Sequence, residues 1–514
     1  MLPETKRSLF CRDYQRGMTA SVMVVLKYRF PKRIGADQRL YNMQGMLGFP
    51  GKEEILQFIS DNNVRILNLC HIPEDGRLRT LSFSATNKDR VAEILDSGER
   101  ADGSSLFSSI DPCKSDIYLQ PKTQRAFMDP FAMLPTLSIV CDYLDENGEL
   151  LEVAPSSVLR KAEENLCSSK GIVLKAFAEL EFYIIAPQQT RPLFPAEPDR
   201  NYHASSPFAQ FENVQNETLA ALEMMGIQTK YGHGEVGSML KKRNTLLEQH
   251  EIEFIPQTLS QMAETIGLAK WALRNICSRH GVSVSFIPKI DLAHAGTGMH
   301  VHMYATRKGK NIIADQDRSL SKEALAMIGG ILKFAPSLSA FGNPTPVSYL
   351  RFIARKESPM HICWSARNRL ALIRIPLWWD FKDPPNAESC RETFEYRAPD
   401  AFANAHILLA GLALAVEHGL SNSEETVRIA QDLHVEHLVC KSGKLGVLPR
   451  SCSESAANLR KQRQLYETND VFPRKLIDNV LSRLEAYGDK NLWEELSTKP
   501  KMFENIVTQF VHYG

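Results

Sequence analysis

The chain has 514 residues, 43% hydrophobic and 24% charged, so it is long enough for a large core and for more than one domain. Its 61 Lys and Arg side chains balance 60 Asp and Glu side chains, and the net charge of +1 gives no electrostatic reason to expect a nucleic acid or a membrane as partner. The ten cysteines are scattered without a CxxC pair, which gives no sign of a zinc site or a disulfide framework.

The first fifty residues are predicted to be an N-terminal extension, 1–50. They are basic at both ends, lack a clear period and close on GFPG. The longest apolar run in this part, at 18–26, is too short to cross a bilayer and leads into basic residues. We therefore expect neither a membrane span nor a cleaved leader, and the single, unpaired cysteines favour a reduced, cytoplasmic protein.

From residue 51 the pattern changes to that of a small α+β unit, predicted to span 51–140. EEILQFISDNN is typical of an amphipathic helix, and VRILNLCHI and LRTLSFSA are typical of strands separated by the turn PEDGR. The strand-rich stretch LSIVCDYLDENGELLEV leads into the main body, 141–514. There, a helix is predicted over 258–280, with Gly281 in the position of a left-handed C-cap.

Three stretches of the main body place polar side chains on one face of a predicted strand. In AFAELEFYII (176–185) the even positions are apolar, whereas Glu179 and Glu181 share the other face. Their Cα atoms would lie about 6.6 Å apart, where two carboxylates repel by roughly 2 to 3 kcal/mol at an effective dielectric near 20. The same alternation pairs side chains in GTGMHVHM and FEYRAPD, namely His300 with His302 and Glu395 with Arg397.

Each of these pairs taken alone is more often a solvated or structural feature than a site. Together, three strands that point Glu/Glu, His/His and Glu/Arg from apolar backs predict one shared cavity. Carboxylate oxygens with one imidazole favour Mg²⁺ or Mn²⁺ over zinc, and a bound cation would offset the repulsion between the acids.

Several blocks in order give the chain a resemblance to a known family. FAELEF, EQHEIEF, SFIPKIDLAHAGTGMHVHM, SARNRLALIRIP and FEYRAPDAFANAHILLAGLALA resemble the successive signature blocks of the glutamine synthetase family, and DGSSL with Ser115-Asp116 resembles its amino-terminal block. The resemblance runs from about residue 52 to the carboxyl end. The chain is similar to a bacterial-type glutamate–ammonia ligase or to a close γ-glutamyl ligase of that family.

This resemblance implies an α+β fold with an N-terminal β-grasp domain and a catalytic domain whose curved antiparallel sheet is flanked by helices. It implies homo-oligomeric rings, a decamer or dodecamer, with active sites between subunits. The implied reaction joins glutamate and ammonia: ATP phosphorylates the γ-carboxylate, and ammonia displaces the phosphate to give glutamine. Two or three Mg²⁺ or Mn²⁺ ions per site would assist, since phosphoryl transfer needs cations on the phosphate oxygens.

The implied metal ligands are five glutamates and one histidine. For the ion nearer glutamate the matching positions are Glu181, Glu235 and Glu251, and for the ion nearer the nucleotide phosphates they are Glu179, His300 and Glu395. The separation from Glu251 to His300 is the family's usual one, which favours Glu251 over Glu248 or Glu253 as the ligand.

The remaining implied positions concern the substrates. Arg369 and Arg374 match the phosphate-binding arginines, and His302 and Tyr304 fall where nucleotide contacts occur. The glutamate site matches Gly296, Arg351 and Arg397, and Glu357 matches the glutamate of a flap that closes over the intermediate. Asp102 matches the acid that accepts a proton from ammonium, which must become neutral to attack.

The chain also departs from the family pattern. Fifteen residues separate Glu235 from Glu251, more than usual, and RFIARKESP lacks the usual proline, glycine and aromatic residue before Glu357. Ala295 replaces an asparagine, and Thr393 replaces an arginine. These changes leave two alternatives to a glutamate–ammonia ligase. One is a γ-glutamyl ligase that uses an organic, polyamine-like amine, and the other is a non-catalytic structural relative, although the complete set of metal ligands speaks against the latter.

Overall fold

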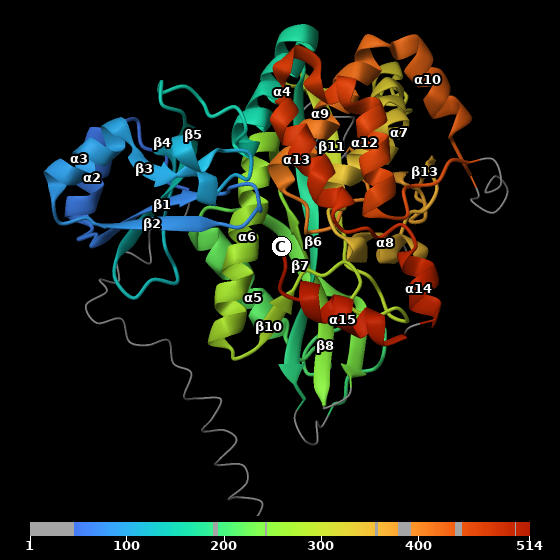
Figure 1. Ribbon diagram of the computed structural model, residues 1–514. Coiled ribbons are helices and arrows are strands. Elements are labelled where there is room, and N and C mark those ends of the chain that lie inside the picture. The colour runs from blue at the N-terminus through green and yellow to red at the C-terminus, as the bar shows by residue number, and fades with distance from the viewer. Residues whose placement is uncertain are drawn as a thin grey trace, which may run out of the picture.

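The computed structural model describes residues 46–188, 194–241, 244–354, 358–378, 392–436, 445–498 and 500–514. These residues form two sheets, each with helices packed against it (Figure 1). The smaller sheet belongs to the amino-terminal part and the larger one to the rest of the chain. The predicted extension lies almost entirely outside the described residues.

The amino-terminal unit is a five-stranded sheet with the order β2-β1-β5-β4-β3. Its β1 and β5 are parallel and the other neighbours antiparallel. The elements are α2 (Lys52–Asp61), β1 (Ile66–His71), β2 (Arg79–Ser84), α3 (Lys88–Ser97), β3 (Glu99–Asp102), β4 (Asp116–Met128) and β5 (Thr136–Leu144). The helix and the two strands predicted first along this unit are confirmed. The predicted boundary at residue 140 falls inside β5.

The large sheet has ten strands, with the main path β13-β14-β15-β11-β6-β8-β7. Its neighbours on this path are antiparallel except for the parallel pair β13–β14. The strands are β6 (Val173–Pro187), β7 (Thr229–Lys241), β8 (Thr245–Phe254), β9 (Gln257–Thr258), β10 (Ser283–Ser285), β11 (Met299–Arg307), β12 (Lys310–Asn311), β13 (Trp364–Ala366), β14 (Ile373–Ile375) and β15 (Phe394–Tyr396).

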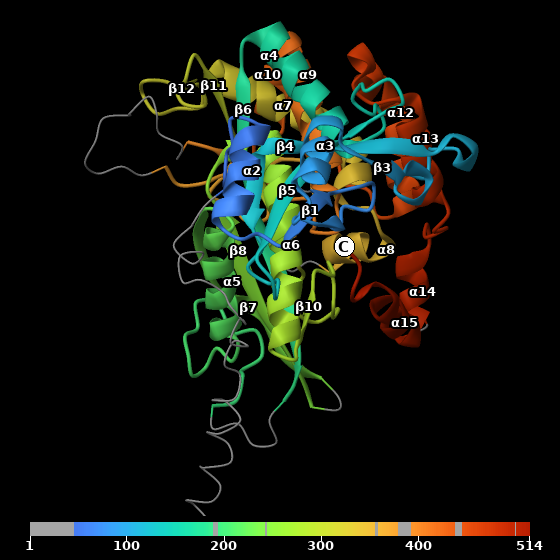
Figure 2. The same ribbon diagram turned by 90° about the vertical axis from the view of Figure 1, so that its left-hand side faces the viewer.

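Helices surround the large sheet and supply most of the hydrophobic core (Figures 1 and 2). The predicted helix over 258–280 is α6, which Thr258 caps with its side chain, and Gly281 beyond it has φ of +68° as predicted. The helices are α4 (Pro155–Lys170), α5 (Glu212–Met224), α6 (Leu259–Arg279), α7 (Lys322–Gly342), α8 (Pro346–Ile353), α9 (Ala405–Ser421), α10 (Ser423–Asp432), α12 (Cys452–Glu467), α13 (Arg474–Glu485), α14 (Leu492–Thr498) and α15 (Pro500–Phe510).

One helix of the described residues, α7, is long and apolar enough to cross a membrane by length and composition. However, 83% of its apolar window is buried inside the structure, where α7 packs against α9, α10 and α12. Such burial is what the core helix of a soluble protein shows.

A buried ionic cluster fastens the amino-terminal unit to α6. Glu264 is 5% exposed, and its carboxylate accepts hydrogen bonds from the Lys122 ammonium and from Arg125 Nε at 2.7 Å. Lys122 also lies 3.3 Å from Asp142 on β5. The two cations hold the pKa of Glu264 below its ordinary value although burial alone would raise it. Since buried charges are tolerated only when paired, this cluster fixes how the two sheets sit relative to each other.

Candidate active site

The sheet order places the three polar strands side by side. β15 lies next to β11, β11 next to β6, and β6 next to β8. In this register Glu179 faces His300, His302 faces Glu395, and Glu181 faces Glu251. The apolar side chains that alternate with these residues on β6 and β11 are buried in the core. The polar side chains therefore lie on the opposite face of the sheet. The predicted meeting of these strands at one cavity is therefore confirmed.

The cavity has a volume of about 550 Å³. Most of the residues around it are charged or aromatic. It is lined by Glu179, Glu181, Asp199, Tyr202, Lys230, Tyr231, His233, Glu235, Val236, Gln249, Glu251, Glu253, Ala295, Gly296, His300, His302, Arg351, Ser358, Arg369, Arg374, Pro376 and Arg397. This is the size of a small-molecule site.

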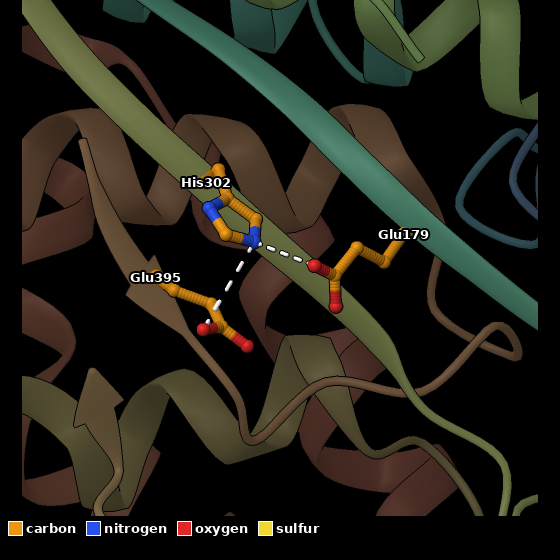
Figure 3. Close-up of side chains that lie close together, drawn as sticks. All are labelled: Glu179, His302 and Glu395. Atoms are coloured by element: carbon orange, nitrogen blue, oxygen red, sulfur yellow. Dashed lines mark hydrogen bonds and ion pairs between the residues drawn. The ribbon is translucent and has the colours of Figure 1, made fainter. Parts of the chain in front are cut away.

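Glu179 lies between the two histidines of β11. Its Oε2 is 2.7 Å from His300 Nδ1. Its Oε1 is 2.8 Å from His302 Nε2, the contact that Figure 3 shows. Burial alone would raise the pKa of Glu179, but the two imidazoles hold it well below its ordinary value. Phe177 stacks on the His302 ring at 4.3 Å and fixes its plane. Glu179 is thus held as an ionised carboxylate in a buried position.

Glu251 has the opposite environment. It is 7% exposed, and burial together with repulsion from neighbouring carboxylates, Glu179 foremost, raises its pKa well above the usual value. Burial also raises the pKa of Glu181, although Arg351 opposes that effect. His233 Nε2 lies 3.2 Å from Glu251 Oε1, and a ring nitrogen of His300 lies within 4.8 Å of a Glu251 oxygen. A divalent cation supplies the charge that these carboxylates lack, so the donor set fits Mg²⁺ or Mn²⁺.

Three groups of side chains in the described residues bring a potential ligand atom from each member within 4.8 Å of one another. They are Glu179 with His302 and Glu395, Glu179 with Glu251 and His300, and His233 with Glu235 and Glu251. All six predicted metal ligands line or adjoin the cavity, but the groups combine them differently from the predicted sets. Glu181 belongs to none of the three and instead accepts hydrogen bonds from Gly298 N at 2.8 Å and Gln249 Nε2 at 3.0 Å. The assignment of ligands to particular ions stays a prediction.

The predicted arginines surround Glu395, which has no exposed surface. Arg374 Nη1 donates to Glu395 Oε2 at 2.8 Å, and Arg397 Nη1 donates to Oε1. Arg351 donates to the backbone oxygens of Ala398 at 2.8 Å and Arg397 at 3.1 Å, just beyond β15, which fixes the position of its guanidinium. Arg369 also lines the cavity. Four guanidinium groups in the lining make the cavity suitable for a phosphate or carboxylate.

Gly296 closes the cavity floor beside Arg351. A Cβ at this position would lie 2.9 Å from Pro288 O and 3.0 Å from Arg351 Cγ, so only glycine fits without a shift. Gln249 Nε2 donates to Gly296 O at 2.9 Å and fixes this segment. The predicted close approach of backbone to the cavity is consistent with this geometry.

Two predicted residues lie outside the cavity lining, and a third is not among the described residues. Tyr304 is 6% exposed and packs in the core, outside the cavity lining, and Glu357 lies outside the described residues. Asp102 is exposed at the end of β3, where it caps the short 3₁₀ helix η3 (Gly103–Ser105) and accepts hydrogen bonds from Ser104 and Ser105. The Ser105 hydroxyl, followed by Ser104, lowers the pKa of Asp102 to about 2. The roles of these residues remain predictions.

Sequence reasoning missed an aromatic group at the acidic end of the cavity. His233 packs within 4.5 Å of the His203 ring and 5.4 Å of Tyr202, and His203 stacks on Tyr202 at 4.2 Å. Tyr231 lies 5.8 Å from His233 and donates its hydroxyl to Glu253. The alternation that pairs Glu179 with Glu181 also pairs His233 with Glu235, so His233 could have been predicted from the sequence. Tyr202 and His203 come from a loop with no such signal.

Comparisons with known proteins place the chain among its relatives. Residues 152–486 match the model of the glutamine synthetase catalytic domain, and residues 63–146 match that of the glutamine synthetase beta-Grasp domain. The glutamine synthetase of Thermotoga maritima is 30% identical over 459 residues, covering 87% of this chain and 96% of that protein. That of Azorhizobium caulinodans is 29% identical over 490 residues, covering 88% and 98%.

Solved structures share the fold. The cryo-EM structure of Plasmodium falciparum glutamine synthetase superimposes with a TM-score of 0.74 at 20% identity, covering 87% of this chain and 97% of that one. A structure described as "Apo GmaS without ligand" gives a TM-score of 0.70 at 19% identity, covering 87% and 96%. The predicted α+β fold with an N-terminal β-grasp domain is confirmed.

Proposed function

This chain belongs to the glutamine synthetase family, and we propose that it ligates ammonia to the γ-carboxylate of L-glutamate at the expense of ATP. The reaction would pass through γ-glutamyl phosphate and give glutamine, ADP and phosphate. The observation that carries the proposal is the cavity itself, in which buried glutamates and histidines from β6, β8 and β11 face four arginines. A cavity that combines buried carboxylates with guanidinium groups suits a metal-assisted transfer of a phosphoryl group to an acid.

The proposed metal sites use the residues named from the sequence. Glu181, Glu235 and Glu251 would hold one divalent ion, and Glu179, His300 and Glu395 a second, with His233 and His302 close enough to join them. When bound, Mg²⁺ or Mn²⁺ would withdraw charge from the phosphate oxygens of ATP. The buried, unneutralised state of Glu251 supports this reading, because burial of a carboxylate without a cation is costly.

The arginines would position the two substrates. Arg369 and Arg374 face the cavity where the transferring phosphate would sit and would stabilise its oxygens by charge-assisted hydrogen bonds. Arg351, which lies beside Gly296, and Arg397, which also lines the cavity, would bind the glutamate carboxylates. The bonds from Arg374 and Arg397 to the fully buried Glu395 hold both side chains in one geometry before substrate arrives.

One observation favours an organic amine as a second candidate acceptor. The rings of Tyr202, His203, Tyr231 and His233 stand beside Glu235 and Glu251, and Tyr202 and Tyr231 are 47% and 44% exposed. Aromatic faces next to carboxylates attract organic cations through the ring quadrupole and the negative charge together. An amine with a carbon chain would use these rings, whereas ammonia would contact only the acids.

The deciding experiment measures products. Purified protein is incubated with L-glutamate, ATP and Mg²⁺, with ammonium in one series and methylamine, ethanolamine, putrescine and spermidine in the others, while ADP and γ-glutamyl products are quantified. Glutamine formation from ammonium as the fastest reaction supports the ligase proposed first. Faster turnover of an organic amine, with glutamine at background, replaces it by the second candidate.

Two variants complete this experiment. Glu179→Ala should abolish ADP release with every amine, because it removes the carboxylate between both histidines. Tyr231→Ala should raise KM for an organic amine while leaving KM for ATP unchanged, and should leave KM for ammonium unchanged. Wild-type protein that releases no ADP with glutamate and any amine would overturn both candidates and favour a non-catalytic relative.

A further inference from the structure

A second cavity lies where three distant parts of the chain meet. It has a volume of about 660 Å³ and is bounded by the turn after β1, by α6 and by the last residues of the chain. In both ribbon views the carboxyl end, marked C, lies close to α6 (Figures 1 and 2). Its lining within the described residues has no member in common with the lining of the active cavity. It is therefore a separate site by position.

The lining of this cavity is basic and aromatic. It contains Arg77 and Leu78 from the turn after β1, Trp271 and Arg274 from α6, Phe286 beyond β10, and His512 and Tyr513 at the chain end, together with the small or polar residues between them. No carboxylate belongs to this lining among the described residues. Asp75, two residues before Arg77, is paired with Arg79 at 2.6 Å.

Arg274 is the notable member of the lining. It is half-buried, its guanidinium lies 5.1 Å from the centre of the Phe286 ring, and within the described part of the chain it makes no hydrogen bond or ion pair. Arginine has five donors, and a half-buried guanidinium without an acceptor is unusual. Burial, followed by the charge of Arg77, lowers the pKa of Arg274 to about 10, although the charge of Asp75 acts in the opposite direction.

Arg77 adds a second guanidinium to the same cavity. Its Nη2 donates to the backbone oxygen of His512 at 3.0 Å, so one edge of the group is fixed by the chain end. One turn before Arg274, the buried Lys270 bonds Ala401 O at 2.7 Å and does not belong to the lining. Two guanidinium groups thus meet at a cavity whose described lining contains no carboxylate. This arrangement is suited to an anion from outside the chain.

We propose that this cavity binds a small organic anion, whose phosphate or carboxylate group is held by Arg274 and Arg77 while its apolar part packs against Trp271 and Phe286. The volume is within the range of small-molecule sites. Because Arg77 belongs to the amino-terminal unit and Arg274 to α6, a bound anion would bridge the two units. The proposal is independent of the reaction carried out in the active cavity.

Calorimetric titration of the full, metal-free protein tests the proposal. Phenyl phosphate and benzoate are the two anionic probes, inorganic phosphate tests the charge alone, and phenol tests the ring alone. Wild-type protein should bind phenyl phosphate or benzoate at least tenfold more tightly than phenol, and the comparison of the two anions decides between a phosphate and a carboxylate ligand. Arg274→Gln should weaken that binding at least tenfold, since one charge-assisted bond is worth about a factor of ten.

Two controls separate this site from other causes. Arg369→Gln alters the active cavity and should leave the tighter binding unchanged, which excludes anion binding at the catalytic arginines. Arg274→Gln should not lower the melting temperature, because its guanidinium bonds to no described residue. Wild-type protein that binds neither anion more tightly than phenol overturns the proposal, as does binding that Arg274→Gln retains or Arg369→Gln abolishes. Exclusion of all probes because a neighbouring copy fills the cavity also overturns it.

Discussion

Two buried glutamates of β8 have different environments: Glu248 accepts hydrogen bonds within the fold, whereas Glu251 faces the active cavity. Glu248 has no exposed surface and accepts hydrogen bonds from the backbone N–H groups of Gln210 at 2.9 Å and Phe211 at 3.0 Å, next to the start of α5. Glu251 faces the active cavity, where the imidazole of His233 lies 3.2 Å from its Oε1. The two carboxylates lie three residues apart and point to opposite faces of the strand.

Glutamine substitutions at these two positions should have opposite effects. Glu251→Gln should leave the metal-free protein as stable as wild type or more so, because it removes a buried carboxylate whose pKa is raised. It should also reduce the stabilisation by millimolar Mg²⁺ or Mn²⁺ by about 1.4 kcal/mol for each tenfold loss of affinity. Glu248→Gln should lower the free energy of unfolding by about 1 to 3 kcal/mol, since one buried donor loses its acceptor.

Thermal unfolding of the three proteins with and without metal provides the measurement. Glu248→Gln serves as the matched control because it should keep the metal-dependent shift while losing stability. A Glu251→Gln protein that retains the full metal shift would remove Glu251 from the metal site. A wild-type melting temperature that does not respond to either ion would remove the site as a whole.

At this scale the sequence predicted the members of the site better than their partners. Alternation along a strand was enough to place Glu179, Glu181, His300 and Glu395 toward one cavity, because a strand side chain has only two faces. It was not enough to choose which three side chains meet, since that depends on strand register and rotamers. His302 therefore lies against Glu179, where the sequence analysis expected a nucleotide contact.

Lys270 gives a pH dependence whose sign is fixed by its burial. The side chain is 2% exposed, and burial, with Arg274 nearby, lowers its pKa from 10.5 to about 7. Between these values the unfolded chain binds more protons than the folded one, so stability should rise as pH increases from about 7 toward 10.5. Each pKa unit corresponds to roughly 1.4 kcal/mol.

Lys270→Met should expose this contribution. Near pH 7 the substitution should stabilise the protein, because it removes a buried charge that folding disfavours. Near pH 9.5 it should stabilise much less or destabilise, because neutral Lys270 keeps its bond to Ala401 O and methionine does not. Denaturant unfolding at both pH values measures the difference, and an effect of Lys270→Met that is the same at both would contradict the assigned pKa.

At the scale of elements, local patterns predicted α2, β1, β2 and α6 nearly to their ends. Local patterns could not predict the order of the large sheet, because the neighbours of β11 are distant in the sequence. β6 ends more than a hundred residues before β11 begins, and β15 begins more than eighty residues after β11 ends. That arrangement came only through the resemblance to a known family. Local patterns also could not predict which helices pack together, and the contact of α9 with α7 is an example.

α9 and α7 approach so closely that glycine is required at one contact. A Cβ on Gly419 would lie 2.3 Å from the backbone oxygen of Ala326, whereas a Cβ on Gly411, also on α9, would meet a Leu338 methyl at 3.1 Å. A backbone oxygen inside a packed helix cannot move away, but a leucine side chain can adjust. Alanine adds the same helix propensity at both sites, roughly 1 kcal/mol.

Gly419→Ala should therefore destabilise the protein by several kcal/mol, and Gly411→Ala should change its stability by about 1 kcal/mol or less. Both substitutions lie far from the cavity lining, so neither should alter KM for ATP in protein that remains folded. Chemical denaturation of the pair gives the answer directly. Equal effects would mean that α9 and α7 are not as closely packed as the structure has them.

At the scale of the whole molecule, the active cavity is incomplete within one subunit if Asp102 takes part in the reaction. Asp102 stands at the exposed end of β3, in the amino-terminal unit, and is not among the residues that line the cavity. Its bonds to Ser104 and Ser105 keep it ionised, so it would attract an ammonium ion rather than act as a strong base. We propose that the carboxylate reaches the cavity of a neighbouring subunit in a homo-oligomeric ring.

Mixing of two inactive variants tests that arrangement. Asp102→Asn keeps the capping acceptor of η3, since asparagine is also a good N-cap, and should fold normally while losing most of its ligase activity. Glu251→Gln should be inactive for a different reason, within the cavity itself. If each site combines residues of two subunits, random hybrids should regain activity in about a quarter of their sites, because a closed ring repeats one interface between neighbours.

Dissociation of the two proteins, reassembly as a mixture and assay of glutamine formation measure this recovery. A mixture with no more activity than its components, although Asp102→Asn alone is inactive, would mean that Asp102 and Glu251 of each site come from one subunit, which contradicts the proposed arrangement.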